Sequence, residues 1–223
     1  SAVEHVAALG LEWMETDLRL TADGVVVLSH DEDLYRTAND PRTVGEVMWA
    51  ELADLDSGDG RGFVRLDDAL YAQPAMKFNI DLKDSSVVQA ALQTVRDAQA
   101  LDRVRFASFS ARRLAVLRRQ EPRAMTSLGV SDVLGLMLRS EAAVPLPQTR
   151  WGWTRGRVDA VQVPESYHGV PVVTRRFVAS AHIAGLEVHV WTVDDPERMR
   201  HLADLNVDAI MTDVPSLALK TLS

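Results

Sequence analysis

The sequence predicts an α/β protein built on parallel strands, and three observations lead to this prediction. From Met76 to the end, strand-length apolar stretches alternate with helix-length amphipathic ones, a pattern that produces parallel strands joined by right-handed crossovers. Residues 25–29 form a β-branched apolar run, typical of a strand buried on both faces. Titratable side chains stand where several predicted strands end, the edge at which parallel α/β folds place their active sites.

The first strand is predicted at residues 11–18, where polar and apolar side chains alternate. A helix end at residues 1–9 precedes it and is closed by Gly10. Because side chains two apart on a strand share a face, three side chains point the same way. These are Trp13, Glu15 and Asp17.

After a turn at residues 21–24, the strand at 25–29 ends at His30. Residues 31–62 are mostly polar and predict a long excursion at one end of the fold, with a short helix within 43–52. Loops of this length are usually functional or mobile.

The remainder of the chain alternates regularly. The further predicted strands are residues 76–82, 104–108, 124–128, 159–163, 187–192 and 208–212. The predicted helices are residues 86–100, 110–119, 132–139, 174–184, 196–205 and a last one from Pro215, with Ser110 as a cap. Residues 144–157, which contain two prolines, predict a loop. The pattern alone leaves a closed barrel and an open doubly wound sheet as alternatives.

Length, charge and composition limit the possible domain organisation and classes of function. The 223 residues favour one domain over 1–223, with two small domains as the alternative. The net charge of −8 argues against a nucleic-acid partner, which requires a basic face. The absence of cysteine excludes disulfides and thiolate chemistry and fits a cytoplasmic location. No stretch approaches a transmembrane span, no signal peptide is visible, and no glycine-rich phosphate loop is present.

The strongest functional signal is the set of titratable residues at predicted strand ends. It comprises Glu15 and Asp17, His30, Asp81 and Lys83, and Asp213. Carboxylates gathered on a buried face are costly unless they are neutralised. Oxygen ligands from Glu15, Asp17 and Asp81 suit one divalent cation, Mg²⁺ or Ca²⁺. The alternative is a structural network of ion pairs. His30 is suited to proton transfer near neutral pH.

Other histidines and tryptophans carry weaker signals. Trp191 is expected to line a pocket, whereas the role of His189, on the same strand face, stays open. Three tryptophans in predicted loops mark a substrate cleft or a lipid-contacting lid, or else are side chains tucked onto the rim of the fold. These are Trp49, Trp151 and Trp153.

The order of motifs resembles the glycerophosphodiester phosphodiesterase family. Residues 15–18 (ETDL), 21–24 (TADG) and 26–31 (VVLSHD) are similar to the family's ExD, T-x-DG and HD block, which 34–37 (LYRT) continues. Residues 79–83 (NIDLK) resemble its N-I-E-I-K strand, and 108–109 (SF) its S-F strand end. Residues 190–196 (VWTVDDP) and 210–213 (IMTD) resemble its last two strands. The similarity covers nearly the whole chain in the family's order.

The resemblance implies a (β/α)₈ TIM barrel and a site within it. Glu15, Asp17 and Asp81 would hold the cation, His30 would be one of two catalytic histidines, and Lys83 would contact the phosphate in a catalytic and substrate-binding role. Two further residues would shape the substrate pocket: Phe109 and Trp191.

The sequence departs from the family pattern in two places, and both affect the implied site. The third ligand is Asp81 where the family commonly has glutamate, so we expect a shifted metal. The family's opening strand, with its H-R-G motif, is not among residues 1–223, so the barrel lacks its first strand in this sequence and we expect a further segment before Ser1. Counted with that strand, one predicted strand is surplus, and residues 124–128 or 159–163 are the first to drop.

The function implied by the resemblance is hydrolysis of glycerophosphodiesters to an alcohol and glycerol 3-phosphate. The substrate would be a small-molecule or lipid-derived phosphodiester. One alternative is lysophospholipase D-type hydrolysis of lysophospholipids, with loop tryptophans contacting acyl chains. Another is a non-catalytic barrel that binds phosphodiesters, if the H-R-G segment is absent. The composition is compatible with a monomer or a homodimer.

Overall fold

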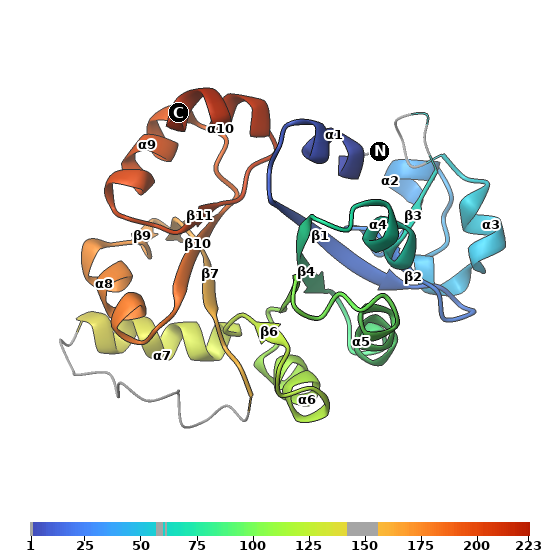
Figure 1. Cartoon of the computed structure of the whole chain (residues 1–223), viewed down its shortest axis with the longest axis horizontal. Coiled ribbons are helices and arrows are strands. Elements are labelled where there is room, and N and C mark those ends of the chain that lie inside the picture. Colours follow the sequence, from blue (N-terminus) through green and yellow to red (C-terminus); the bar gives the residue numbers. More distant parts are fainter. Residues whose placement is uncertain (1, 57–59, 61, 142–155) are drawn as a thin grey trace. The chain divides into compact units, whose positions relative to one another are not determined.

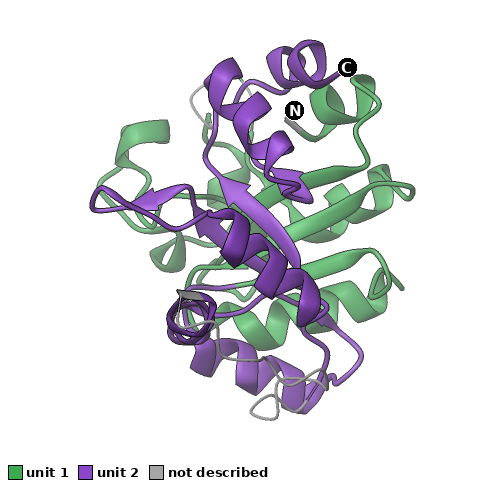
Figure 2. Cartoon of the chain, turned by 90° about the vertical axis from the view of Figure 1, so that its left-hand side faces the viewer, with its two compact units in different colours: residues 1–107 green, residues 108–223 purple. Residues whose placement is uncertain are grey.

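The protein is described by a computed structural model that covers residues 2–56, 60, 62–141 and 156–223. Contacts within the chain divide it into two compact units, Ser1–Ala107 and Ser108–Ser223 (Figures 1 and 2). Each unit combines strands and helices, which confirms the predicted α/β class. The hydrogen bonds of the described strands form open mixed sheets and no closed ring.

The sheet of the first unit runs in the order β3-β2-β1-β4-β5. Its strands are β1 (Trp13–Leu20), β2 (Val26–Leu28), β3 (Val64–Arg65), β4 (Lys77–Leu82) and β5 (Val104–Ala107). Its helices are α1 (Ala2–Ala8), α2 (Tyr35–Ala38), η1 (Val44–Glu46), α3 (Trp49–Ala53), α4 (Leu66–Ala72) and α5 (Val87–Asp97). Strands β1, β4 and β5 are parallel, as predicted.

The strand predicted at residues 25–29 is confirmed as β2, but its direction departs from the parallel pattern of the fold. β2 is antiparallel to β1, with Leu18 opposite Leu28 and Leu20 opposite Val26. The connection of five residues is too short for a crossover, since parallel neighbours need a dozen or more residues between them. Gly24 makes the tight return possible, because its φ of +83° is in the left-handed region.

The two faces of β1 and β4 differ in polarity. One face carries Phe78, Ile80 and Leu82, all fully buried, and α5 packs against β1 and β2. The other face carries polar residues in register across the strands: Glu15 is opposite Asn79, and Asp17 is opposite Asp81. Alternation along two parallel strands therefore places all of these carboxylates on one side of the sheet.

The excursion after β2 is packed around a small core of its own. Its buried side chains are Val27, Leu34, Val44, Val47 and Leu52. Trp49 is partly buried against this core, and the guanidinium of Arg65 lies 5.8 Å from the centre of its ring. Trp49 thus takes the tucked arrangement of those that we considered, while Trp151 and Trp153 lie outside the described residues.

The second unit holds a parallel sheet in the order β11-β10-β7. Its strands are β6 (Met125–Thr126), β7 (Ala160–Pro164), β8 (Ser166–Tyr167), β9 (Val170–Pro171), β10 (Glu187–Trp191) and β11 (Ala209–Ile210). Its helices are α6 (Ala111–Gln120), α7 (Val130–Glu141), α8 (Arg175–Ile183), α9 (Pro196–Asp204) and α10 (Pro215–Leu222). Three of these helices begin at a side-chain cap, since Ser110, Thr174 and Asp195 each accept a hydrogen bond from the N–H three residues on.

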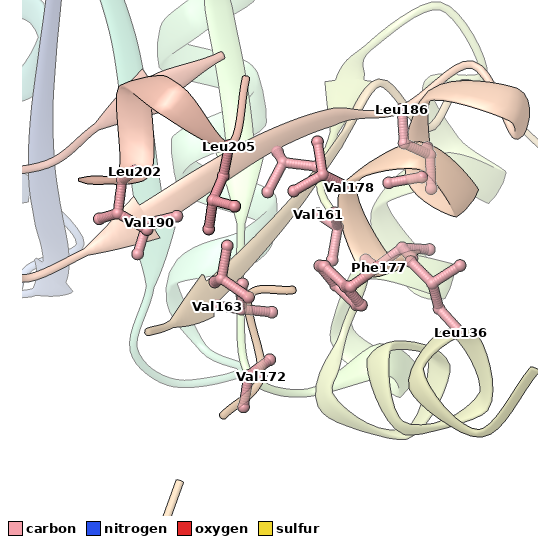
Figure 3. Packing of buried hydrophobic residues seen from close by; sticks show 14 of the residues in the cluster. Leu136, Val161, Val163, Val172, Phe177, Val178, Leu186, Val190, Leu202 and Leu205 are labelled. Carbon is pink, nitrogen blue, oxygen red and sulfur yellow. The ribbon is translucent and has the colours of Figure 1, made fainter. Parts of the chain in front are cut away.

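Apolar side chains of β7 and β10 pack against the helices of this unit (Figure 3). Val161 and Val163 on β7 meet Phe177 and Val178 on α8 within one buried cluster. Both stretches that we considered surplus form strands, so that expectation is wrong. The N–H of Leu128, just after β6, donates to the carbonyl of Ala160 at 2.9 Å. β6 is two residues long, which explains its weak sequence signal.

Among the described residues, no helix is long and apolar enough to cross a membrane.

We predict opposite effects for two glycines at the start and middle of α7. A Cβ at Gly129 would lie 2.5 Å from the backbone of Ala111, so Gly129→Ala should lower the free energy of unfolding by about 1–3 kcal/mol through overpacking. A Cβ at Gly135, inside the helix, would meet nothing within 4 Å, so Gly135→Ala should raise it by about 0.5–1 kcal/mol. Urea denaturation of both variants measures the two effects. Equal stability of the two variants would contradict this account.

Candidate active site

Strands β1 and β4 bring two acidic side chains together. Asp17 and Asp81 are direct neighbours across the parallel pair, and their side chains are 13% and 11% exposed. Glu15 lies one step earlier on the same face of β1, opposite the buried Asn79, and is itself exposed. β1 continues beyond Asp17 to Leu20 as one arm of the hairpin, so the two predicted ligands lie inside β1, at the end of its parallel segment.

Lys83 lies between the two aspartates. Its Nζ is 2.8 Å from Oδ1 of Asp17 and 2.9 Å from Oδ2 of Asp81. Burial lowers the pKa of Lys83, but its hydrogen bonds to Asp17 and Asp81 outweigh that effect and raise the pKa above its ordinary value. The lysine is therefore fully charged at neutral pH and neutralises part of the acidic face.

The donor set suits a hard divalent cation in its chemistry. Three carboxylates on one sheet face are the oxygen ligands that Mg²⁺ and Ca²⁺ prefer, and one positive charge, the Lys83 ammonium, already lies within 3 Å of two of them. In the part of the chain that the structure describes, no three acidic, histidine or cysteine side chains stand ready as a metal cluster.

His30 follows β2 and is held by its sequence neighbour. Its Nδ1 lies 2.8 Å from Oδ1 of Asp31, and the Nε of Arg36 donates to Oδ2 of Asp31 at 2.6 Å. The imidazole is largely exposed. The hydrogen bond from Arg36, followed by that of His30, lowers the pKa of Asp31 against the opposing effect of burial. Asp31 is thus an ionised carboxylate that contacts Nδ1 and leaves Nε2 available.

The backbone ties His30 to the acidic strand. The N–H of Ser29 donates to the carbonyl of Asp17 at 2.9 Å, and Arg19 donates to the carbonyl of His30 at 3.2 Å. The antiparallel hairpin, which the sequence pattern did not predict, is therefore the element that connects the histidine with β1.

In the second unit, the two predicted pocket residues contact each other. Phe109 and Trp191 pack edge to face, with ring centroids 5.6 Å apart and an interplanar angle of 77°. Phe109 lies before α6 and is 58% exposed, and Trp191 ends β10 opposite Pro164 of β7. Trp191 is partly buried, and an aromatic pair with one exposed ring near strand ends is suited to contact a ligand.

Two other titratable residues of the second unit make specific contacts. Asp213 lies just after β11, where its N–H donates to Oδ1 of Asp194 at 2.9 Å. His189 is buried, and its Nε2 lies 3.0 Å from Oε2 of Glu187 on the same strand. The side chain of His189 is therefore packed on the sheet, where Glu187 is its polar partner.

Several polar residues around the acidic face were not predicted from the sequence. Asn79 and Arg105 are buried and in register with Glu15 across β4 and β5, and the guanidinium of Arg105 lies 4.8 Å from the centre of the Trp13 ring. The period-2 pattern that identified Asp81 also marks Asn79, and an arginine inside an apolar strand run is a similar signal. Asp31 was noticed only as a neighbour of His30.

Comparison with known proteins gives a consistent match. Residues 1–217 match the glycerophosphoryl diester phosphodiesterase family. The chain is 37% identical over 214 residues to a probable glycerophosphodiester phosphodiesterase 2 of Mycobacterium tuberculosis, an alignment that covers 95% of this chain and 80% of the relative.

Solved structures of the same kind share the fold. A putative glycerophosphoryl diester phosphodiesterase from Silicibacter pomeroyi aligns with a TM-score of 0.77 at 25% identity, covering 98% of this chain and 85% of that one. An Oleispira antarctica phosphodiesterase, in complex with its product sn-glycerol-3-phosphate, aligns with a TM-score of 0.77 at 19% identity, covering 99% and 89%.

Proposed function

This chain belongs to the glycerophosphoryl diester phosphodiesterase family, and we propose that it hydrolyses glycerophosphodiesters to an alcohol and glycerol 3-phosphate with the help of one divalent cation. The observation that carries the site assignment is the pair of facing carboxylates of Asp17 and Asp81, both of which contact the ammonium of Lys83. Family membership supports the reaction, and the position of this carboxylate pair supports placing the phosphodiester and the cation beside it.

The ligands of the cation in this proposal are Glu15, Asp17 and Asp81, with Mg²⁺ or Ca²⁺ as the ion. Such a cation, when bound, neutralises the phosphate oxygens and stabilises the negative charge that develops on them. The ammonium of Lys83 adds a second positive contact to the phosphate. Phe109 and Trp191 shape the pocket for the organic part of the substrate.

His30 transfers a proton in this proposal through Nε2, because Nδ1 is engaged by Asp31. In hydrolysis a P–O bond to water forms, the P–O bond to the alcohol breaks, and one proton passes from the water to the alcohol oxygen. His30 serves one of these two proton transfers.

We also propose that residues 1–223 belong to one (β/α)₈ barrel domain, and that the protein acts as a monomer or a homodimer. The likeness to solved structures over 98–99% of the chain supports one shared architecture. Light scattering of the purified protein distinguishes the two assembly states.

The test is an assay of glycerol 3-phosphate release from glycerophosphocholine by the complete protein. We expect release that stops after treatment with a chelator and returns on addition of Mg²⁺ or Ca²⁺. Release of phosphocholine in place of glycerol 3-phosphate would contradict the reaction, and full activity after metal removal would contradict the cation. Faster turnover of lysophosphatidylcholine than of glycerophosphocholine would favour the lysophospholipase D alternative.

Phe109→Ala is expected to raise KM with little change in kcat. Removing the ring deletes a substrate contact and the edge-to-face pair with Trp191, and aromatic pairs of this kind are worth about 0.5–1.5 kcal/mol. Because a loss of uniform binding appears in KM alone, we expect KM to rise by roughly two- to tenfold. Tyr71→Ala on α4 is the control, since Tyr71 is similarly exposed and has no proposed role. An equal KM for both variants would remove Phe109 from the pocket.

A further inference from the structure

Lys83 has an environment that a phosphate contact alone does not explain. Its Nζ lies within 3 Å of carboxylate oxygens from two strands, Asp17 on β1 and Asp81 on β4. All three side chains are less than 20% exposed. The two aspartates stand in register, so their backbones hold the carboxylates side by side.

Two carboxylates in this position repel each other, because partial burial removes most of the water that would screen them. A cation between them offsets that repulsion. The Lys83 ammonium supplies the cation from within the chain, and it does so from a position fixed only two residues beyond Asp81. The long, flexible side chain of lysine allows the ammonium to move while the backbone stays in place.

We propose that Lys83 is a built-in counter-ion that competes with the divalent cation for Asp17 and Asp81. When the cation binds, it displaces the ammonium, which is then free to contact the substrate phosphate. Metal loading and the presentation of Lys83 to the phosphate are therefore one coupled event. This inference rests on the proposed function, because it takes Asp17 and Asp81 as metal ligands.

The two possible roles of Lys83, competing with the metal or supporting its binding, predict opposite changes in metal affinity when Lys83 is removed. If Lys83 arranged the carboxylates for the metal, its removal would weaken metal binding. If Lys83 competes, its removal takes away the ammonium that contacts both carboxylates and therefore strengthens metal binding. The sign of the change in affinity therefore decides between the two roles without any measurement of activity.

The experiment compares Lys83→Met with wild type by calorimetric titration of Ca²⁺ and of Mg²⁺ into chelator-treated protein. We expect K83M to bind the cation about tenfold more tightly, in line with the coupling measured for close charge pairs. We also expect metal-free K83M to melt at a lower temperature than wild type. At the same excess of metal it should gain more stability, because stabilisation by a ligand grows with the logarithm of its concentration divided by Kd.

Lys77→Met is the matched control. Lys77 is the first residue of β4, the strand that Lys83 directly follows; it forms an ion pair with Glu12 at 3.0 Å and carries the same charge. We expect K77M to bind metal as wild type does. If K83M fails to fold without metal, Lys83→Gln removes the charge with a smaller change in polarity and takes its place in the titration.

The outcomes separate the two proposals. Wild-type binding with equal or weaker binding by the Lys83 variants would overturn the competition and leave the cation site standing. No binding by any protein at millimolar metal would overturn both the cation site and the competition. Tighter binding by Lys83 variants, but not by K77M, is the result that we expect.

Discussion

Replacing Glu15 with glutamine is expected to lower kcat/KM for glycerophosphocholine by on the order of a hundredfold or more. The substitution keeps the size of the side chain and removes its charge, so the cation loses one of three anionic ligands. A bound metal contributes several kcal/mol to the stabilisation of developing charge, and each 1.4 kcal/mol corresponds to about tenfold in rate. Because Glu15 is exposed, we expect little change in stability from the exchange.

The measurement is a set of kinetic assays at increasing metal concentration. If Glu15 acts through metal affinity, high metal should restore part of the activity of Glu15→Gln. Glu12→Gln is the control, because Glu12 lies three residues earlier and pairs with Lys77 in an exposed position. It should keep wild-type kcat/KM. Full activity of Glu15→Gln without bound metal would remove Glu15 from the site.

The predictability of this site follows from the alternation along two strands. Alternation along residues 11–18 and 76–82 predicted which side chains share a face. The structure shows that β1 and β4 are parallel neighbours with Asp17 opposite Asp81, a pairing that the sequence did not predict. Strand alternation is a local property that a sequence shows directly. The partner of each carboxylate is not local, so the position of Lys83 between the two aspartates required the structure.

Two features of the strands were not predicted from the sequence, and both involve short turns. The run of residues 25–29 has the composition of a central parallel strand, yet the short turn before it allows only an antiparallel hairpin. Connection length was therefore the better signal. The hairpin β8–β9 was missed although its turn residues, His168 and Gly169, have φ of +49° and +80°. A glycine after a turn-forming residue is the usual mark of such two-residue turns.

The composition of the excursion after β2 did not predict its small apolar core. Its polar sequence indicated a long loop, and the structure shows short helices around five buried apolar side chains. Val27 belongs to β2, and the four side chains from the excursion itself, Leu34, Val44, Val47 and Leu52, form no periodic pattern. Local polar bonds complete the arrangement, as where Thr43 and Glu46 form a capping box at η1. A small core of this kind is visible only once the chain has folded.

His30→Ala is expected to lower kcat by about 10²–10⁴-fold, the range that a positioned proton-transfer group contributes. Metal binding should be unchanged, because His30 makes none of the contacts proposed for the cation. The acid or the base limb of the pH–rate profile should also disappear, and which one is lost assigns His30 as base or acid. His182→Ala is the matched control, since His182 also pairs with an aspartate, Asp208, at 2.8 Å and has no proposed catalytic role.

Asp31→Asn tests the orientation and tautomer of the His30 imidazole while the ring itself is kept. The carboxylate of Asp31 accepts the Nδ1 proton and so keeps Nε2 unprotonated in the neutral ring. An amide can instead donate to Nδ1 and favour the opposite tautomer, so kcat should fall while KM and metal affinity stay near wild type. The lowered pKa of Asp31 keeps this carboxylate ionised until the pH falls below its ordinary value of 3.8, so the orientation should persist across the neutral range. Nitrogen chemical shifts of His30 report the tautomer directly, and unchanged shifts in Asp31→Asn would show that Asp31 does not set it.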